Sequence, residues 1–465
     1  MNILLVNPPI RESVPAYFHP IGLASVAAVL RQAGHEVQIL DLNMLRPKRE
    51  QLLDIVPDKK FDWVGVSGLI TTYEYLKFLV PFLRWRYSVP IVVGGGGITS
   101  APETYMEYVK PDLGVLGEGE YTSVDICKVL LGEMHIKDVP GLIYMDGNVP
   151  ARTPPRPLEK NLDSFPTPAW DLLDMGGYAN NVRHSRARRE LAMLATRGCP
   201  YNCGFCYHIF GRGVRYRSVK RVVDEMQHHI DNYKTSAFLF GDECLTVNRK
   251  WIVEFCNEIL RRGMEADWMC YTRADALDEE TMLLMKRSGC FRVGYGVESG
   301  SQRILDAMGK RISLDVVRGA MLMASRIFGQ VGITLIFGYP GENDETIRET
   351  AEFLKGVGMV TKFFHLSPYP ETRVFEENKD KILARYGTLD AFFSNLSDAG
   401  RFATNLTDWT DEEYCKKKFW LIREVEESIT VRRAWQQYDR AMQVEANSMD
   451  GQPKGRFYRL LGGTQ

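Results

Sequence analysis

The sequence predicts an α/β protein built of two parts and followed by a helical tail. Two separate series of short apolar runs alternate with longer helical patterns, and a proline-rich stretch divides the two series. Runs that are apolar throughout suit strands buried on both faces, and their alternation with helices indicates parallel sheets. We therefore expect a doubly wound parallel sheet, then a partial TIM-like barrel of six βα units, then helices.

The first series covers residues 1–137. Its expected strands are residues 2–6, 36–40, 63–67, 91–93 and 113–116, and its expected helices are residues 22–32, 73–87 and 122–131. Ligands of a doubly wound sheet bind at the carboxyl ends of its strands. The candidate binding loops are therefore residues 7–20, 68–73 and 94–102.

Residues 138–189 interrupt this alternation. Residues 139–149 predict a small hairpin that turns at Asp146-Gly147-Asn148, and the proline-rich residues 150–168 predict an irregular linker. A basic run follows, made of Arg183, His184, Arg186, Arg188 and Arg189. Such runs are usually solvated, although this one could meet a phosphorylated or carboxylated substrate.

The second series covers residues 190–375. Its expected strands are residues 191–195, 237–240, 267–271, 292–296, 333–337 and 362–366. Six βα units are fewer than the eight of a closed barrel, so we expect an open one. Residues 376–465 are helical in pattern, with a long charged helix over residues 411–433, and their aromatic residues suit a cap over the open barrel.

Composition excludes several classes of protein. Apolar residues make up 45% and charged residues 25% of 465 residues, as in soluble globular proteins. The net charge of −1 gives no electrostatic reason to expect nucleic acid, and no apolar run is long enough for a membrane span. The N-terminus lacks a basic segment and reads as a strand rather than a signal peptide. Three of the nine cysteines lie within eight residues, which favours metal in a reducing compartment, so we expect a cytoplasmic protein.

The three grouped cysteines are Cys199, Cys203 and Cys206, in a loop that follows the first strand of the second series. Three thiolates so close together suit one zinc ion, with His208 as a fourth ligand, or one iron–sulfur cluster. A four-iron cluster on three thiolates leaves one iron free to bind a chelating molecule and pass it an electron. The position of the loop at the carboxyl end of a barrel strand favours the cluster.

This CxxxCxxC loop, with Phe205 before its third cysteine, resembles that of the radical S-adenosylmethionine (SAM) superfamily. The resemblance extends over residues 190–372 and implies a [4Fe–4S] cluster, SAM and a 5′-deoxyadenosyl radical. It also implies a site at successive strand ends. Asp242 and Glu243 would meet the SAM amino group, and Arg273 its carboxylate.

Two further strand ends complete the implied SAM site. Glu298 and Ser299 would reach the ribose and sulfonium region, and residues 338–341 look like the turn on the adenine side. Each fragment alone is weak, because a carboxylate at a strand end is more often a helix cap than a ligand. The occurrence of all these fragments in this order, each at the end of a strand, makes the resemblance to the superfamily specific.

The first 137 residues resemble the cobalamin-binding domain found in one branch of this superfamily. The similar stretches are residues 7–9, 20–24, 33–37 with Asp41, 117–120, and the linker residues 161–168. Gly95 and Gly96 would let the backbone approach the nucleotide tail of a corrinoid, and Thr99 and Ser100 would hydrogen-bond it. A glycine run by itself requires only a tight turn.

Two departures concern the cobalt ligand. Gly97 stands where the family often has histidine, and the axial-ligand signature DxHxxG is incomplete, since Tyr17 replaces its aspartate while His19 and Gly22 are present. No carboxylate partner that would orient His19 is local. We therefore expect His19 to be a loop residue before a helix rather than the axial ligand.

The leading hypothesis is a cobalamin-dependent radical SAM enzyme that resembles class B methyltransferases and methylates an unactivated carbon of a small molecule. The alternative is a radical reaction without methyl transfer, such as dehydration, oxidation, cyclisation or rearrangement. A corrinoid or SAM sensor is the non-enzyme alternative. The complete cysteine loop argues against it, because a sensor has no need of an open redox iron. The resemblance implies an external electron donor of flavodoxin or ferredoxin type. A methylthiotransferase is disfavoured, because its first domain needs three cysteines and this one has only Cys127.

The other barrel cysteines lack the spacing of a second cluster. They are Cys244, Cys256, Cys270 and Cys290, and we expect them to be buried small apolar side chains.

Overall fold

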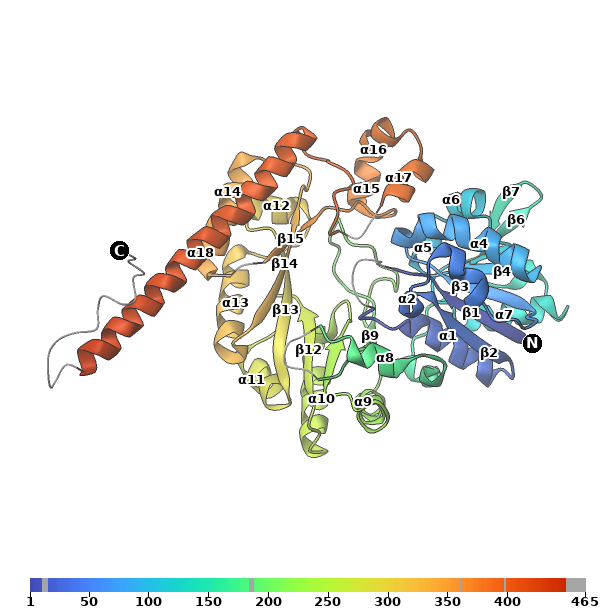
Figure 1. The fold of residues 1–465 in the computed structure, drawn as a ribbon, viewed down its shortest axis with the longest axis horizontal. Coiled ribbons are helices and arrows are strands. Elements are labelled where there is room, and N and C mark those ends of the chain that lie inside the picture. Colours follow the sequence, from blue (N-terminus) through green and yellow to red (C-terminus); the bar gives the residue numbers. More distant parts are fainter. Residues whose placement is uncertain (11–15, 184–187, 360, 397–398, 449–465) are drawn as a thin grey trace.

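A computed structural model describes residues 1–10, 16–183, 188–359, 361–396 and 399–448, with side chains up to residue 430. The two parts lie side by side, and the last helix runs along the outer side of the second part and beyond it (Figure 1). Part of the loop at residues 7–20 falls outside the described residues, and so do His184 and Arg186 of the basic run. No described helix is both long and apolar enough to cross a membrane.

The first part is a sheet of seven strands in the order β2-β1-β3-β4-β5-β6-β7. The first five strands are parallel and confirm the prediction: β1 (Asn2–Asn7), β2 (Glu36–Asp41), β3 (Trp63–Ser67), β4 (Ile91–Gly94) and β5 (Leu113–Val115). The predicted hairpin forms β6 (Leu142–Asp146) and β7 (Val149–Arg152). It pairs antiparallel with β5 and so extends the sheet, which the sequence did not indicate.

Helices cover both faces of this sheet, as in a doubly wound fold. Ile3 and Leu5 belong to one core cluster with residues of α1 (Ile21–Gln32) and α7 (Glu120–Leu130). Leu4 and Val6 belong to another, with residues of α4 (Tyr73–Tyr87). Successive residues of a strand point to opposite faces, so β1 is buried on both.

The segment at residues 94–102 is not the continuous loop that was expected. It contains the short helix α5 (Gly96–Ser100), followed by α6 (Pro102–Thr104). Gly95 has φ of +96°, a conformation that L side chains rarely adopt, and turns the chain from β4 directly into α5. The glycine run therefore serves as a strand-to-helix turn.

The second part is an open half-barrel of six parallel strands in the order β15-β14-β13-β12-β11-β8. All six predicted strands are confirmed: β8 (Glu190–Met193), β11 (Ala237–Phe240), β12 (Asp267–Thr272), β13 (Cys290–Glu298), β14 (Val331–Phe337) and β15 (Lys362–His365). The helices between them are α9 (Val219–Tyr233), α10 (Arg249–Arg261), α11 (Glu279–Arg287), α12 (Gln302–Ala307), α13 (Leu314–Phe328) and α14 (Asp344–Val357).

A small antiparallel ladder follows β8. It pairs β9 (Thr196–Arg197) with β10 (Arg215–Tyr216), and the cysteine loop is the segment between these two strands. The ladder thus fixes both ends of the loop that carries the three grouped thiols.

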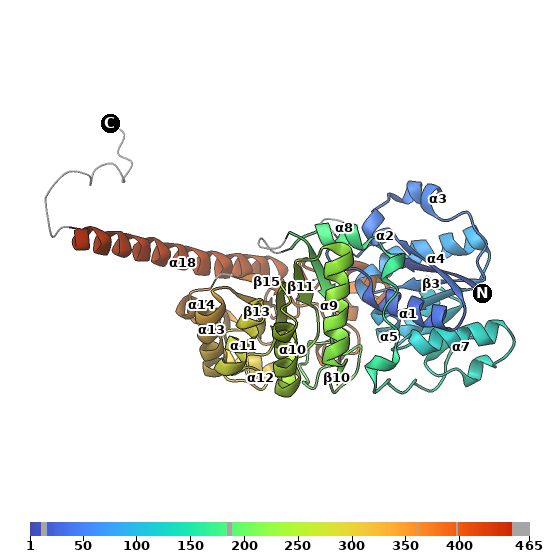
Figure 2. The same cartoon turned by 90° about the horizontal axis from the view of Figure 1, so that it is seen from below.

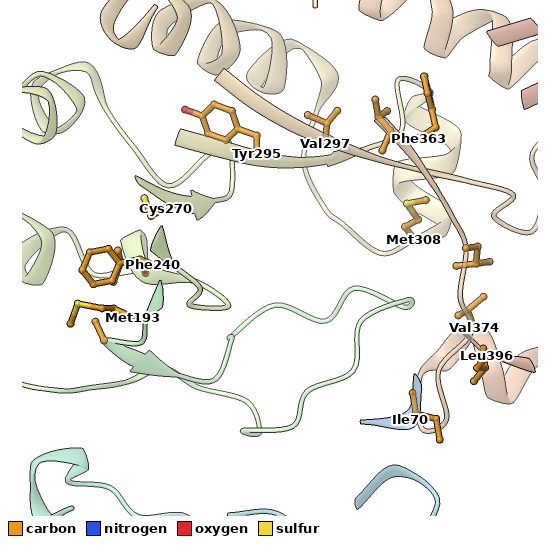
Figure 3. Close-up of a cluster of buried hydrophobic side chains, with 14 of the residues drawn as sticks. Ile70, Met193, Phe240, Cys270, Tyr295, Val297, Met308, Phe363, Val374 and Leu396 are labelled. Atoms are coloured by element: carbon orange, nitrogen blue, oxygen red, sulfur yellow. The ribbon is translucent and has the colours of Figure 1, made fainter. Parts of the chain in front are cut away.

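The tail links the two parts. Three short helices, α15 (Arg373–Glu377), α16 (Lys379–Tyr386) and α17 (Leu389–Asn395), come first. Asp390 of α17 accepts hydrogen bonds from Tyr73 and Lys77 of α4, each at 2.8 Å. Figure 3 shows Ile70 of the first part near Val374 and Leu396 of the tail, and all three belong to one apolar core.

The long helix α18 (Asp411–Ser448) packs against α14 and projects past the barrel (Figure 2). Of the tail's aromatic residues, Phe392 and Phe393 are buried and Trp409 stacks on Phe337, whereas Phe419 and Trp420 are exposed.

Candidate functional site

A cavity of about 300 Å³ opens where the predicted binding loops meet the barrel. Its walls are the carboxyl ends of β1, β3, β4 and β5 together with four barrel residues, Leu194, Arg197, Ile209 and Phe210. The last three come from β9 and the cysteine loop. One cavity is therefore shared by the first domain and by the segment that carries the grouped thiols.

The cavity reaches down between the sheet and helices α1 and α7. Its deep part is lined by Leu5, Trp63, Gly65, Val92 and Val115, so its surface is mostly apolar. A Cβ atom added at Gly65 would lie 2.7 Å from a methyl carbon of Leu5. The side chains of Leu5 and Trp63 therefore pack directly on Gly65 and give the cavity an apolar wall, which suits the flat base of a corrinoid's nucleotide tail.

The glycine turn forms part of the cavity wall. A Cβ atom at Gly95 would lie 2.7 Å from the carbonyl oxygen of Gly68, and one at Gly96 would lie 3.1 Å from Ile209 of the cysteine loop. Thr99 donates to the carbonyl oxygen of Gly95 at 2.8 Å and accepts from the amide of Gly117 at 3.1 Å. The Thr99 hydroxyl thus maintains the shape of the wall, and its contact with a ligand stays a prediction.

His19 lies away from this cavity. Its ring packs against Trp170 at 5.0 Å and Tyr178 at 5.7 Å between centroids, and it is not among the lining residues. Burial lowers the pKa of His19 to about 3, and neither ring nitrogen has a hydrogen-bond partner in the described part of the chain. The structure therefore gives no support to His19 as a cobalt ligand.

Cys199, Cys203 and Cys206 are all free thiols in the loop between β9 and β10. The middle of the loop is held by backbone hydrogen bonds from Gly204 to Met308 at 2.8 Å and from Val374 to Gly204 at 2.9 Å. No three His, Cys, Asp or Glu side chains of the described residues converge on one metal ion. In a four-iron cluster each thiolate binds a different iron, so the three thiols need not meet at one point. The soft, free donor set fits such a cluster.

A fourth thiol lies beside the first. A hydrogen bond from Cys244 lowers the pKa of Cys199 to about 6, whereas burial raises the pKa of Cys206 to about 12. Cys244 is buried, as expected, and so are Cys256, Cys270 and Cys290. The contact between Cys244 and Cys199 was not predicted, since nothing in their spacing indicates it.

Asp242 and Glu243 follow β11 but differ in their surroundings. The buried Asp242 carboxylate accepts hydrogen bonds from the amides of Ala195 at 2.9 Å and Thr196 at 2.5 Å, and thereby ties down the start of the cysteine loop. Glu243 as a residue is exposed, but the surrounding protein partly desolvates its carboxyl group. This desolvation raises the pKa of Glu243 to about 7. Of the two, only Glu243 is an exposed residue and therefore accessible to an incoming ligand.

Glu298 forms a buried ion pair with Lys310, with 3.1 Å between Oε1 and Nζ. Glu298 has φ of +69°, a strained conformation for a residue other than glycine, and such strain is concentrated at functional sites. The Lys310 ammonium lies 6.0 Å from the ring of Phe205 in the cysteine loop. Lys310 is a candidate site residue that the sequence did not reveal, because only the folded chain brings it to Glu298.

Arg273 and Ser299 already have protein partners. The Arg273 guanidinium makes two hydrogen bonds of 2.9 Å to Asp275 and lies 3.9 Å from the ring centroid of Tyr201 in the cysteine loop. Ser299 is buried and accepts from the amide of Ser301 at 3.1 Å. Both residues border the expected SAM site, and direct contact with SAM stays a prediction for each.

Two family profiles match the chain. The B12 binding domain matches residues 8–126 and the Radical SAM superfamily matches residues 193–354. The chain is 33% identical to an uncharacterized methyltransferase, PH0819, of Pyrococcus horikoshii, over 81% of this chain and 83% of that protein. It is 26% identical to an anaerobic magnesium-protoporphyrin IX monomethyl ester cyclase of Rubrivivax gelatinosus, over 82% and 71% of the two chains.

The fold is also that of a solved structure. The radical SAM methyltransferase TsrM from Kitasatospora setae, with cobalamin and a [4Fe–4S] cluster bound, superposes with a TM-score of 0.68 at 21% identity, covering 82% of this chain and 75% of that one. The two domains therefore have the same relative arrangement as in that structure.

These similarities settle the class of protein. The expected cofactors, namely a [4Fe–4S] cluster, SAM and cobalamin, are confirmed at the level of the family, and so is the expectation of an enzyme that needs a reductant rather than a sensor. The chain belongs to the radical SAM superfamily, in the group whose members carry an N-terminal B12 binding domain.

Proposed function

We propose that this enzyme methylates an unactivated carbon of a small molecule. The observation that carries the proposal is the shared cavity, whose walls come from the B12 binding domain and from the cysteine loop. When bound, SAM on the reduced cluster supplies a radical that removes a hydrogen atom from the substrate, and cobalamin supplies the methyl group. Because this cavity reaches the cysteine loop, a corrinoid bound in it and SAM bound at the cluster can act on one substrate carbon.

The roles of the chain's own residues follow from their positions. Residues 1–137 hold the corrinoid, with its tail against the apolar cavity wall that includes Leu5, Trp63 and Val92. Residues 190–375 hold the cluster, through Cys199, Cys203 and Cys206, and SAM. Residues 138–189 connect these two domains, and helix α17 at the start of the tail, residues 376–465, packs on α4 of the first. The largely apolar lining keeps water from the reacting carbon.

We assign the SAM contacts by exposure and charge. Glu243 accepts from the SAM amino group, because it is an exposed residue close to Cys199 of the cysteine loop. Glu298 faces the ribose, with Lys310 holding the carboxylate in place at 3.1 Å. Arg273 and Ser299 directly follow the neighbouring strands β12 and β13 and complete the contacts, and Phe205 lies beside Lys310.

A reaction without methyl transfer is the second candidate. The similarity to an enzyme called a cyclase over 82% of this chain favours it, because that protein matches over both domains as well. In either case an external donor of flavodoxin or ferredoxin type reduces the cluster, and a reducing compartment such as the cytoplasm suits its thiolates.

The two candidates are separated by one experiment. The anaerobic, reconstituted protein is incubated with SAM, a reductant and candidate substrates, with and without methylcobalamin. We expect 5′-deoxyadenosine, together with a product heavier by one methyl group only when methylcobalamin is present. Cys203→Ala serves as the control that forms neither. A product of unchanged carbon count that forms equally without methylcobalamin would refute methyl transfer.

A further inference from the structure

Two arginines and two glutamates join the B12 binding domain to the cysteine loop. Glu118 and Glu120 follow β5, and Arg197 and Arg215 lie in β9 and β10. Glu118 accepts from Arg197 at 2.9 Å and from Arg215 at 2.8 Å, while Glu120 accepts from Arg197 at 2.5 Å. We call these four residues the interdomain clamp.

The clamp is buried. The side chains of Glu118 and Glu120 are 7% and 4% exposed, and each arginine is 13% exposed. Buried charges are costly unless they are paired, and removing one partner leaves the other uncompensated. The clamp therefore differs from the pairs on the surface, which contribute little.

The register of the small ladder explains why both arginines need Glu118. Arg197 and Arg215 are directly opposite each other in the antiparallel pair of β9 and β10. Like charges at opposite positions of a ladder repel. Glu118 lies between them and accepts from both, so the ladder closes on a carboxylate that belongs to the other domain.

The clamp touches both cofactor regions. The ladder brackets residues 198–214, which include the three grouped cysteines, and Glu118, Glu120 and Arg197 also line the shared cavity. The Arg197 guanidinium lies 5.3 Å from the ring centroid of Phe210, another lining residue. A group that enters the cavity therefore meets the residues that hold the ends of the cysteine loop.

We propose that Glu118 and Glu120 are positioning residues that set the cysteine loop against the corrinoid and couple corrinoid binding to the order of that loop. This inference rests on the proposed corrinoid site. It assigns a role to the Gly117–Glu120 segment that goes beyond holding two domains together.

A matched control separates positioning from simple adhesion between domains. Asp390 also forms an ion pair across the domain junction, with Lys77 at 2.8 Å, and hydrogen-bonds Tyr73. It contacts neither β9 nor β10. Asp390→Asn therefore weakens the junction without touching the ladder, whereas Glu118→Gln removes the charge that the two arginines share.

The first measurement is hydrogen exchange in the full chain with its reconstituted cluster, with and without hydroxocobalamin. In wild type we expect hydroxocobalamin to slow exchange across residues 198–214. In Glu118→Gln we expect exchange there to be about tenfold faster and to respond little to hydroxocobalamin. Asp390→Asn should keep the wild-type response.

The second measurement detects position directly. In protein that holds both cob(II)alamin and the reduced cluster, the two paramagnets broaden each other's electron paramagnetic resonance signals to an extent set by their separation. We expect a single defined interaction in wild type and Asp390→Asn, and a weaker or spread interaction in Glu118→Gln. Glu120→Gln, which leaves Glu118 bridging both arginines, should show a smaller change and replaces Glu118→Gln if that variant does not fold.

The outcomes are distinct. Wild-type exchange and spin interaction in both glutamate variants would overturn the clamp while leaving the proposed function standing. Equal changes in Asp390→Asn would also overturn it, because any weakened junction would then suffice. Failure of wild type to take up hydroxocobalamin would overturn the proposed corrinoid site and the clamp's coupling role together.

Discussion

Glu342 should make the stability of this protein decrease as pH rises. The residue follows the turn at the end of β14, is 6% exposed, and accepts from the amide of Gly338 at 2.6 Å. Burial raises its pKa from 4.5 to about 8, an effect that hydrogen bonds from the Gly338 and Tyr339 amides only partly offset. The folded chain therefore keeps this proton at neutral pH, whereas the unfolded chain loses it.

The sign and size of the effect follow from this difference. Between pH 4.5 and about 8 the folded state binds more protons than the unfolded state, so its stability decreases with rising pH. The slope approaches about 1.4 kcal/mol per pH unit, which amounts to about 3 kcal/mol between roughly pH 5 and pH 7.5. Above pH 8 the contribution levels off.

Glu342→Gln removes this titration and keeps an oxygen that can accept from Gly338. We expect its melting temperature, measured by differential scanning calorimetry, to rise relative to wild type as pH is raised, with a small difference near pH 5. Glu426→Gln, at an exposed position of α18, is the control and should parallel wild type. Parallel curves for wild type and Glu342→Gln would show that this carboxyl group does not titrate as we infer.

Three further predictions concern the site. Cys203→Ala should lose the cluster, so that iron analysis after anaerobic reconstitution falls well below about four irons per chain; full iron uptake would contradict its role as a ligand. Lys310→Met leaves Glu298 buried without its partner and should cost about 3–5 kcal/mol in urea unfolding, most of which the double variant with Glu298→Gln should recover. His19→Ala should leave the visible spectrum of bound corrinoid unchanged, because His19 packs against Trp170 outside the cavity; a shifted spectrum would identify His19 as a ligand after all.

The sequence predicts the central strands well because they are buried on both faces. Residues 63–67 and 237–240 are apolar runs between turn residues, and both become strands with the predicted bounds. The helix over residues 73–87 is equally well predicted, because its apolar residues recur at helical spacing. The segment at residues 94–102 was mistaken for a loop because four consecutive glycines disfavour a helix, whereas the structure ties the first turn of α5 to the Gly68 carbonyl through the Gly97 amide at 2.9 Å.

Site residues were predictable only where local spacing carries the signal. The three cysteines lie within one loop, so their grouping is visible in the chain. Lys310 and Cys244 approach Glu298 and Cys199 only through folding, and neither has a spacing that could reveal it. Arg273 shows the opposite case, because its place at a strand end was foreseen while its pairing with Asp275 two residues later was not.

The relative placement of the two domains is what turns two binding folds into one site. Parallel strands end at one edge of a sheet, so each domain alone presents its binding loops along a single edge. The cavity is lined by the carboxyl ends of β1, β3, β4 and β5 and also by Leu194 and Arg197 just after β8, so the two edges face each other. A linker alone does not fix such an arrangement. The buried pairs of Glu118 and Glu120 with Arg197 and Arg215 do, because they bond the loop after β5 to the strands on either side of the cysteine loop.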